Sequence, residues 1–331
     1  MSKPELRDGR SWTFDAYVVG CVFDDDGTCV FALGDGSLRL IDTQGAVKEV
    51  AAHNGACLSM ALHANGGVIT GGDDGRLVHT RGDGATTELA KTRGKWIDHV
   101  AAAPDTGFIA YAAGKEAAIL DGAERTTFAH TSTVAGLTFD PKGRRLAAAH
   151  YDGVSLWWAK ASNQGAKLMK WKGSHLGVTW SPDGRFLVST MQENALHGWR
   201  IEDAADMRMT GYPAKIKSWA WDRRGKFLFT SGAGRVIGWP FTGRAGPMDK
   251  EPRELGPERD ALVTAVATNP RTDAVAAGMS DGAVWIERLD DPGTEYVALK
   301  GDAISALAFS PDGKTLALAS ETGFAALVPF E

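Results

Sequence analysis

Short apolar runs separated by turn-forming residues recur along the whole 331-residue chain. In the last copy the apolar run 304–309 is followed by the turn Ser310-Pro311-Asp312-Gly313 and a second apolar run over 314–319. The first turn of the pattern recurs at Gly27, Gly66, Gly107, Gly143, Gly184, Gly225, Thr272 and Gly313. The intervals between these positions are 39, 41, 36, 41, 41, 47 and 41 residues. Short strands repeating at this period are typical of a β-propeller or another repeat array.

Each copy supplies three strands, and a fourth lies in the interval before the next copy. In copy one the pattern predicts strands over 17–23, 28–33, 37–41 and 46–52. Asp-Gly pairs between these runs favour tight hairpins, because both residues tolerate positive φ. The result is a four-stranded antiparallel blade, and blades arranged radially leave only short edges exposed.

The two ends of the chain complement each other. The last apolar run, 324–330, leaves the eighth blade one strand short, and an unassigned strand over 10–16 stands before copy one. If that strand completes the last blade, the ring is closed without a long open edge. We therefore predict an all-β, single closed propeller domain over 1–331 with eight four-stranded blades. Seven blades is the alternative, if copy three is absorbed differently.

One interval between copies is longer than the others. Residues 243–260 combine Pro, Gly and mixed charge, which predicts a longer surface loop around one outer strand. Elsewhere, the adjacent residues Trp157 and Trp158 must point to opposite faces of their strand, so one of the two is a candidate for exposure.

Composition narrows the class of protein. A net charge of −5 argues against a surface dedicated to nucleic acid or anionic membranes. The first eight residues lack the apolar core of a signal peptide, and no stretch is long enough to cross a bilayer. Cys21, Cys29 and Cys57 are odd in number and lie in or beside predicted strands, which favours reduced, buried thiols. We expect a monomeric ring in the cytoplasm.

Candidate chemistry is sparse. The eight histidines lie between His53 and His197, and no pair has the spacing of a zinc site. The Asp-Gly pairs fit hairpin turns better than calcium loops. The sequence has no nucleophile elbow and no phosphate-binding glycine loop. We expect no catalytic residues, metal or cofactor. Because a ring can bring distant residues together, a propeller hydrolase or lyase with a metal or acid-base site at the axial mouth stays the alternative function.

The chain resembles the WD40-repeat family over nearly its whole length. The residues that carry the resemblance are 309–313, 180–184, 37–42 and 151–157. The resemblance implies a hydrogen-bonded tetrad in each blade, made of a His, a Ser or Thr, an Asp and a Trp, which is stable only if its buried members satisfy one another. Carried over copy by copy, the fragments are His53, Thr70 and Asp74; His130, Asp152 and Trp157 or Trp158; Ser189, Glu193 and Trp199, with Trp171 in the His position; and Tyr212, Thr230 and Trp239.

The resemblance also implies a binding rim, formed by the loops before the first strand and between the second and third strands. The rim positions that carry aromatic, charged or amide side chains are Tyr17, Asp73, Trp96, Asp98, Tyr151, Gln192, Lys215, Lys217 and Glu321. We expect a non-enzymatic scaffold or adaptor that binds a protein or peptide partner there, with Trp96 as anchor. Only Lys215 and Lys217 hint at nucleic acid, which we do not expect as the partner.

Overall fold

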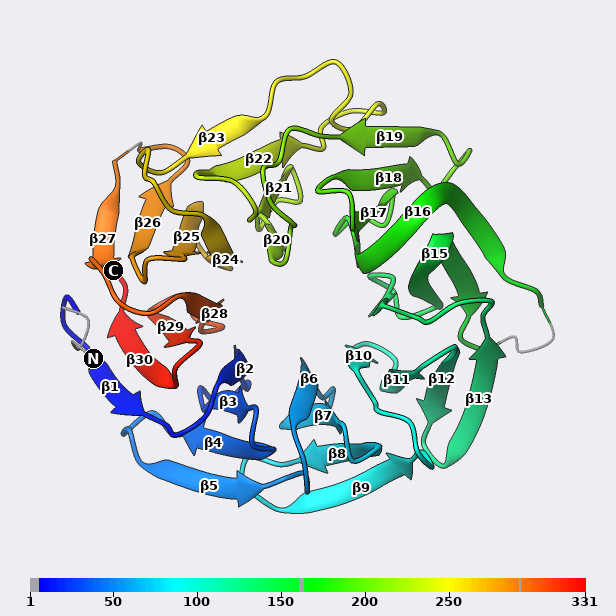
Figure 1. The fold of residues 1–331 in the computed structure, drawn as a ribbon, viewed down its shortest axis with the longest axis horizontal. Helices are drawn as coiled ribbons and strands as arrows, with labels where there is room; N and C mark the ends of the chain where they lie inside the picture. The colour runs from blue at the N-terminus through cyan, green and yellow to red at the C-terminus, as the bar shows by residue number, and fades with distance from the viewer. Residues whose placement is uncertain (1–5, 161–163, 292) are drawn as a thin grey trace. The chain divides into compact units, whose positions relative to one another are not determined.

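The computed structural model describes residues 6–160, 164–291 and 293–331. Within these residues, thirty antiparallel strands form seven hydrogen-bonded sheets, six with four strands and one with six (Figure 1). No helix in the described part of the chain is long and apolar enough to span a membrane.

The chain divides into two compact units, and the first contains the described residues of Met1–Gly34, Arg39–Lys48 and Tyr212–Glu331. Three sheets lie wholly in this unit, and a fourth lies mostly in it. In their hydrogen-bonded order, the three sheets are β1 (Arg10–Thr13), β30 (Phe324–Pro329), β29 (Thr315–Ser320) and β28 (Ile304–Phe309); β20 (Trp219–Trp221), β21 (Phe227–Thr230), β22 (Val236–Pro240) and β23 (Arg253–Leu255); and β24 (Val263–Thr268), β25 (Ala274–Met279), β26 (Val284–Arg288) and β27 (Glu295–Ala298). The fourth is β2 (Val18–Phe23), β3 (Cys29–Leu33), β4 (Ser37–Ile41) and β5 (Val47–Ala51).

The second unit consists of Asp35–Leu38 and Glu49–Gly211. Two of its sheets have four strands: β6 (Cys57–Leu62), β7 (Val68–Gly72), β8 (Arg76–Thr80) and β9 (Thr86–Lys91); and β10 (His99–Ala103), β11 (Phe108–Ala113), β12 (Glu116–Asp121) and β13 (Glu124–Ala129). The third has six: β14 (Gly136–Phe139), β15 (Arg145–Trp158), β16 (Lys167–Trp180), β17 (Phe186–Met191), β18 (Leu196–Arg200) and β19 (Asp206–Met209). The prediction of one domain over 1–331 stays a prediction.

The N-terminal strand completes the last sheet, as predicted. β1 pairs antiparallel with the C-terminal strand β30, from Arg10 opposite Leu327 to Thr13 opposite Phe324. The strand ends at Thr13 rather than at residue 16, and the Phe14 amide still donates to the Gly323 carbonyl at 2.9 Å. The pairing gives β30 a partner along an edge that would otherwise present unpaired backbone groups.

Eight separate blades are not supported. All eight sequence copies form strands, but copies four and five share the six-stranded sheet, so the described residues form seven sheets. The seven-blade alternative assumed that copy three does not form a blade of its own. In the structure copy three does form its own sheet, from β10 to β13.

The long strands β15 and β16 explain the shared sheet. Residues 146–149 of β15 pair with β14, whereas 151–156 pair with β16, and the register shifts between Tyr151 and Gly153. A similar shift in β16 lies between His175 and Gly177. Asp152 and Gly153 have positive φ values of 69° and 142°. A bulge of this kind bends a strand without ending it, so Asp152-Gly153 leaves the second and third strands of copy four continuous as β15. The continuous strand β16 then joins copy four to copy five, because its first half pairs with β15 and its second half with β17.

The segment 243–260 is a loop around one outer strand, as predicted. Residues 253–255 form β23, whose Leu255 pairs with Val236 of β22. Before that strand, the ammonium of Lys250 donates to the Thr242 hydroxyl at 3.1 Å and to the Gly246 carbonyl at 2.6 Å. The cross-strand pairing shortens the irregular part of this segment.

The core lies between neighbouring sheets of each unit. Every residue of β3, β7, β11, β17 and β25 is buried, as expected for short apolar strands covered on both faces. The outer strand β5 instead has one buried residue in five. Cys21, Cys29 and Cys57 are free and buried, which confirms the prediction of buried thiols, and burial raises the pKa of Cys21 and Cys57 to about 12.

Candidate functional site

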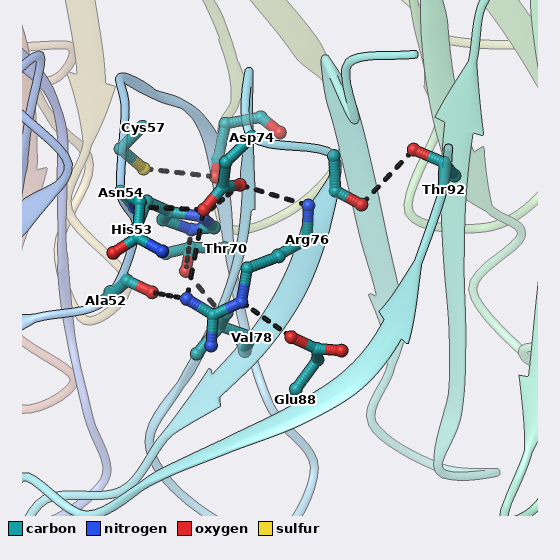
Figure 2. A network of polar contacts seen from close by, with 12 residues as sticks. Ala52, His53, Asn54, Cys57, Thr70, Asp74, Arg76, Val78, Glu88 and Thr92 are labelled. Atoms are coloured by element: carbon teal, nitrogen blue, oxygen red, sulfur yellow. Dashed lines mark hydrogen bonds and ion pairs between the residues drawn. The ribbon is translucent and has the colours of Figure 1, made fainter. Parts of the chain in front are cut away.

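Copy two contains a compact polar network, shown in Figure 2. The Nδ1 atom of His53 lies 3.0 Å from Oδ1 of Asp74, and its Nε2 atom lies 2.9 Å from the Thr70 hydroxyl. Because a carboxylate can only accept, the His53 proton sits on Nδ1, and Nε2 accepts from Thr70. The Asp74 carboxylate also accepts the backbone N–H groups of Asn54 and Arg76, both at 3.0 Å.

The charges in this network favour a neutral imidazole beside an ionised carboxylate. Burial lowers the pKa of His53, although Asp74 opposes that shift. Burial alone would raise the pKa of Asp74, but the amides of Asn54 and Arg76 and the His53 side chain together lower it. The Arg76 guanidinium donates to the Ala52 carbonyl at 3.0 Å and to Glu88 at 2.7 Å. The network thus joins the loop before β6 to the turn after β7, which is a structural role.

Copy six uses a tyrosine where copy two uses a histidine. The Tyr212 hydroxyl lies 2.6 Å from the Thr230 hydroxyl and accepts the indole N–H of Trp239 at 2.6 Å. Thr230 in turn donates to the Ile237 carbonyl at 3.1 Å. Burial raises the pKa of Tyr212 to about 12, so the phenol stays protonated and can donate.

Copy four brings together only part of its fragment. Trp157 donates its indole N–H to Nε2 of His130 at 3.1 Å, and in the described part of the chain no hydrogen bond or ion pair joins Asp152 to either. Burial, followed by the neighbouring His150, lowers the pKa of His130 to about 4. The structure also brings Nε2 of His150 to 2.8 Å from the Ser155 hydroxyl, a pair that the sequence did not predict. Because adjacent strand residues point to opposite faces, one of Trp157 and Trp158 is expected to be exposed. The exposed one is Trp158.

In copy five the structure pairs Ser189 with a histidine that the resemblance did not select. The Nδ1 atom of His175 lies 2.7 Å from the Ser189 hydroxyl, and its Nε2 donates to the Trp171 carbonyl at 3.0 Å. Trp171 is therefore not the partner of Ser189; its ring stacks on His197 with centroids 4.0 Å apart. The sequence signal that could have identified His175 is its spacing from the hydroxyl residue. His175 precedes Ser189 by fourteen residues, whereas His53 precedes Thr70 by seventeen.

The other members of copy five lie around a buried imidazole. The rings of Trp199 and His197 meet edge to face at 4.8 Å, whereas Glu193 is exposed. Burial, then the charges of His175 and Arg208, lowers the pKa of His197 to about 3. Asp206 lies 3.7 Å from its Nε2 atom but is half exposed, so solvent screens that attraction and it does not offset burial. Among the residues that the structure describes, no group of three or more His, Cys, Asp or Glu side chains could hold a metal ion.

The rim positions of the second unit include its most exposed tryptophan. Trp96 is 62 % exposed, directly before the fully buried Ile97. The Ile97 amide donates to the Gly72 carbonyl at 3.0 Å, which places Trp96 beside Asp73. Asp98 follows Ile97, and burial raises its pKa even though His99 lowers it. Trp96, Asp73 and Asp98 therefore form one local group, which we call the Trp96 rim.

A second aromatic position lies in the six-stranded sheet. Tyr151 is 51 % exposed and pairs with Ser174, whose carbonyl accepts the Gln192 amide at 3.0 Å. The structure thus brings Tyr151 and Gln192 to the same end of that sheet.

The predicted rim positions of the first unit form two separate groups. Tyr17 is 46 % exposed, and its pKa is raised by burial and by the negative charge of Glu321, which lies close by. Lys215 and Lys217 are exposed on the segment before β20, where the Lys217 amide donates to the Ser231 hydroxyl at 3.1 Å. The two lysines form the basic group of this unit, and Tyr17 with Glu321 forms the aromatic and acidic one.

Known proteins resemble this chain in sequence and fold. The family model for the WD domain, G-beta repeat, matches residues 122–158. The chromatin assembly factor 1 subunit FAS2 homolog of Oryza sativa subsp. japonica is 30 % identical over 115 residues, which are 32 % of this chain and 23 % of that relative. The match thus spans about a quarter of the relative's length.

Two solved structures share the fold. The computationally designed Ika8 protein has a TM-score of 0.78 at 15 % identity, covering 96 % of this chain and 98 % of its own. A chain of a mitotic checkpoint complex has a TM-score of 0.66 at 16 % identity, covering 100 % and 98 %. Members of the matched family are typically non-enzymatic and typically serve as protein-interaction scaffolds. With its repeated antiparallel sheets, the N-terminal strand that completes the last sheet and these matches, the chain is similar to the WD40-repeat β-propeller family.

Proposed function

We propose that this protein is a non-enzymatic scaffold or adaptor that binds a protein or peptide segment at the Trp96 rim. The observation that carries the proposal is the exposure of Trp96, at 62 %, on a backbone fixed by its buried neighbour Ile97. A large aromatic side chain held rigidly in solvent loses little entropy on binding and is a frequent anchor of protein interfaces.

The charges beside Trp96 favour a particular kind of segment. Asp73 and Asp98 lie on the backbone next to Trp96, so a lysine or arginine of the partner that packs on the indole would be close to acidic side chains. The similarity to a relative named as a chromatin assembly factor subunit supports a partner from an assembly of that kind. A cytoplasmic location and a monomeric state stay predictions beside this proposal.

The substitution Trp96→Ala tests the anchor. We expect at least a ~10-fold loss of affinity for partners that the wild-type protein captures from its host, because a central aromatic anchor contributes about 2 kcal/mol or more. Affinity capture with quantitative mass spectrometry measures the loss, and thermal unfolding checks that the fold is intact.

A matched control is Leu168→Ala, since Leu168 is 49 % exposed on β16, away from the rim. Capture should be unchanged in this variant. Equal capture by wild type and Trp96→Ala would exclude the Trp96 rim as the binding surface.

A further inference from the structure

A cavity of about 600 Å³ opens in the second unit, away from the Trp96 rim. It lies where the turn between β10 and β11 meets the turn between β14 and β15, close to the end of β15. In the sheet of β10, Trp96 precedes the strand and this turn follows it, so the two surfaces are at opposite ends. The side chains that the argument uses are Phe108, Trp158, Lys142, Arg144, Lys160 and Asp105.

The two turns that form the cavity are held together and rigid. Gly143 has a φ of +62°, and a Cβ atom there would stand 2.6 Å from the Thr106 hydroxyl, so the turns are in close contact. The buried carboxylate of Asp140 accepts the amides of Arg144 and Arg145 at 2.6 and 3.0 Å. It also accepts Nε of Arg145 at 3.0 Å. A site of this kind needs little ordering when a ligand binds.

The apolar part of the cavity is aromatic. Phe108 is buried, and its ring stacks on Phe139 with centroids 6.3 Å apart. Trp158 remains 47 % exposed although its strand neighbour Trp157 is hydrogen-bonded inward. The Arg145 guanidinium lies 4.7 Å from the Trp180 ring centroid and 5.8 Å from that of Trp158. Trp158 is therefore supported from behind while its free face stays accessible.

The mouth of the cavity is positively charged. The exposed side chains of Lys142, Arg144 and Lys160 make no ion pair within the described residues, and the Lys160 ammonium lies 5.5 Å from the Phe108 ring centroid. Asp105 is the one acidic residue among the described residues that line the cavity. This local excess of positive charge contrasts with the net charge of −5 of the whole chain.

We infer that this cavity is a second docking site, which binds an acidic peptide segment carrying one aromatic side chain. The aromatic ring packs on the accessible face of Trp158, in the cavity that the buried Phe108 also lines. Carboxylates on either side of it pair with Lys142, Arg144 and Lys160. A single-stranded nucleic acid fits less well, because it needs a basic groove along several nucleotides, whereas these cations surround one cavity.

Fluorescence anisotropy with a labelled peptide, one phenylalanine flanked by glutamates, tests the site on the full-length protein. We expect saturable binding that weakens when salt rises above about 0.1 M, because the carboxylate pairs are partly exposed. Replacing the peptide's phenylalanine by alanine, or its glutamates by glutamines, should each weaken binding at least ~10-fold. Trp158→Ala and Arg144→Glu in the protein should do the same.

Two matched variants separate this site from other surfaces. Lys172→Glu changes an exposed cation elsewhere on β16, and Trp96→Ala removes the rim anchor; both should leave peptide binding within about two-fold of wild type. Loss of binding in Lys172→Glu equal to that in Arg144→Glu would show only general charge attraction and overturn the proposal. Absence of saturable binding, or displacement of the peptide by an equimolar single-stranded oligonucleotide, would overturn it as well.

Discussion

At the scale of single residues, the polar networks show how copies of one repeat solve the same problem with different side chains. Copy two joins His53 to Thr70 and Asp74, whereas copy six joins Tyr212 to Thr230 and a tryptophan. In both, a ring before the first strand reaches a threonine on the second strand. In each network the buried polar groups hydrogen-bond to one another. The hydrogen bond to the threonine, rather than the identity of the ring, therefore fixes the end of the sheet.

The carboxylate of Asp74 has the largest share of copy two's contacts, and its removal should be costly. Asp74→Ala leaves Nδ1 of His53 and the amide of Arg76 without their acceptor, so we expect a loss of about 2–3 kcal/mol in the free energy of unfolding. Urea denaturation followed by circular dichroism measures it.

The exposed Asp83 provides the control in the same sheet. It accepts the Ala85 amide at 2.8 Å in the turn before β9. Asp83→Ala should cost less than about 1 kcal/mol. Equal losses in the two variants would mean that the His53 network adds nothing beyond turn capping.

At the scale of elements, edge pairing and bulges decide where sheets begin and end. β1 completes the sheet that β28, β29 and β30 cannot complete alone, and Gly9, with φ +135°, approaches the Leu327 carbonyl so closely that a Cβ atom would lie 2.7 Å from it. In β15 and β16, register shifts bend the strands without ending them, and β16 pairs with β15 of copy four and with β17 of copy five. Both features depend on backbone geometry at a few positions.

Deletion of residues 1–13 tests the closing strand. We expect a lower unfolding temperature and faster exchange of the β30 amides, because that strand loses the partner on one edge. Hydrogen exchange with mass spectrometry should show the increase in β30 and little change in β7, which lies in the other unit. Unchanged protection of β30 would mean that β1 contributes no stability.

At the scale of the whole molecule, buried histidines link stability to pH. Burial holds the pKa of His130 at about 4 and that of His197 at about 3, below the usual value of 6.5. In the unfolded chain both take up protons as the pH falls through 6.5, whereas in the folded chain they stay neutral. The unfolded state therefore binds more protons, and stability falls as the pH drops from about 6.5 toward 4.

The variant His197→Phe should weaken this pH dependence, because it removes one titrating group and keeps a ring to stack on Trp171. We expect the loss of stability between pH ~6.5 and ~4 to shrink by about 1–2 kcal/mol. Denaturation curves of both proteins over this range measure the two slopes, so any packing change common to all pH values cancels. Identical slopes would contradict the assignment.

The sequence by itself determined the class of fold, because its signals are local. Asp-Gly turns such as Asp312-Gly313 and apolar runs of strand length need no distant partner to be recognised, and the unassigned strand near Arg10 predicted its pairing with the C-terminal strand. The sequence also selected Trp96 and the members of copy two as positions of interest, and the structure brings the latter together.

Only the tertiary structure decided the features that depend on contacts across sheets or on backbone bending. The continuous strand β16 joined copies four and five in one sheet, and a shortened loop gave Ser189 the partner His175 in place of Trp171. The cavity joins the turn before Phe108 to the turn before Arg144, which are far apart in the chain. Composition and residue spacing do not predict these contacts, because the contacts arise from how neighbouring sheets pack.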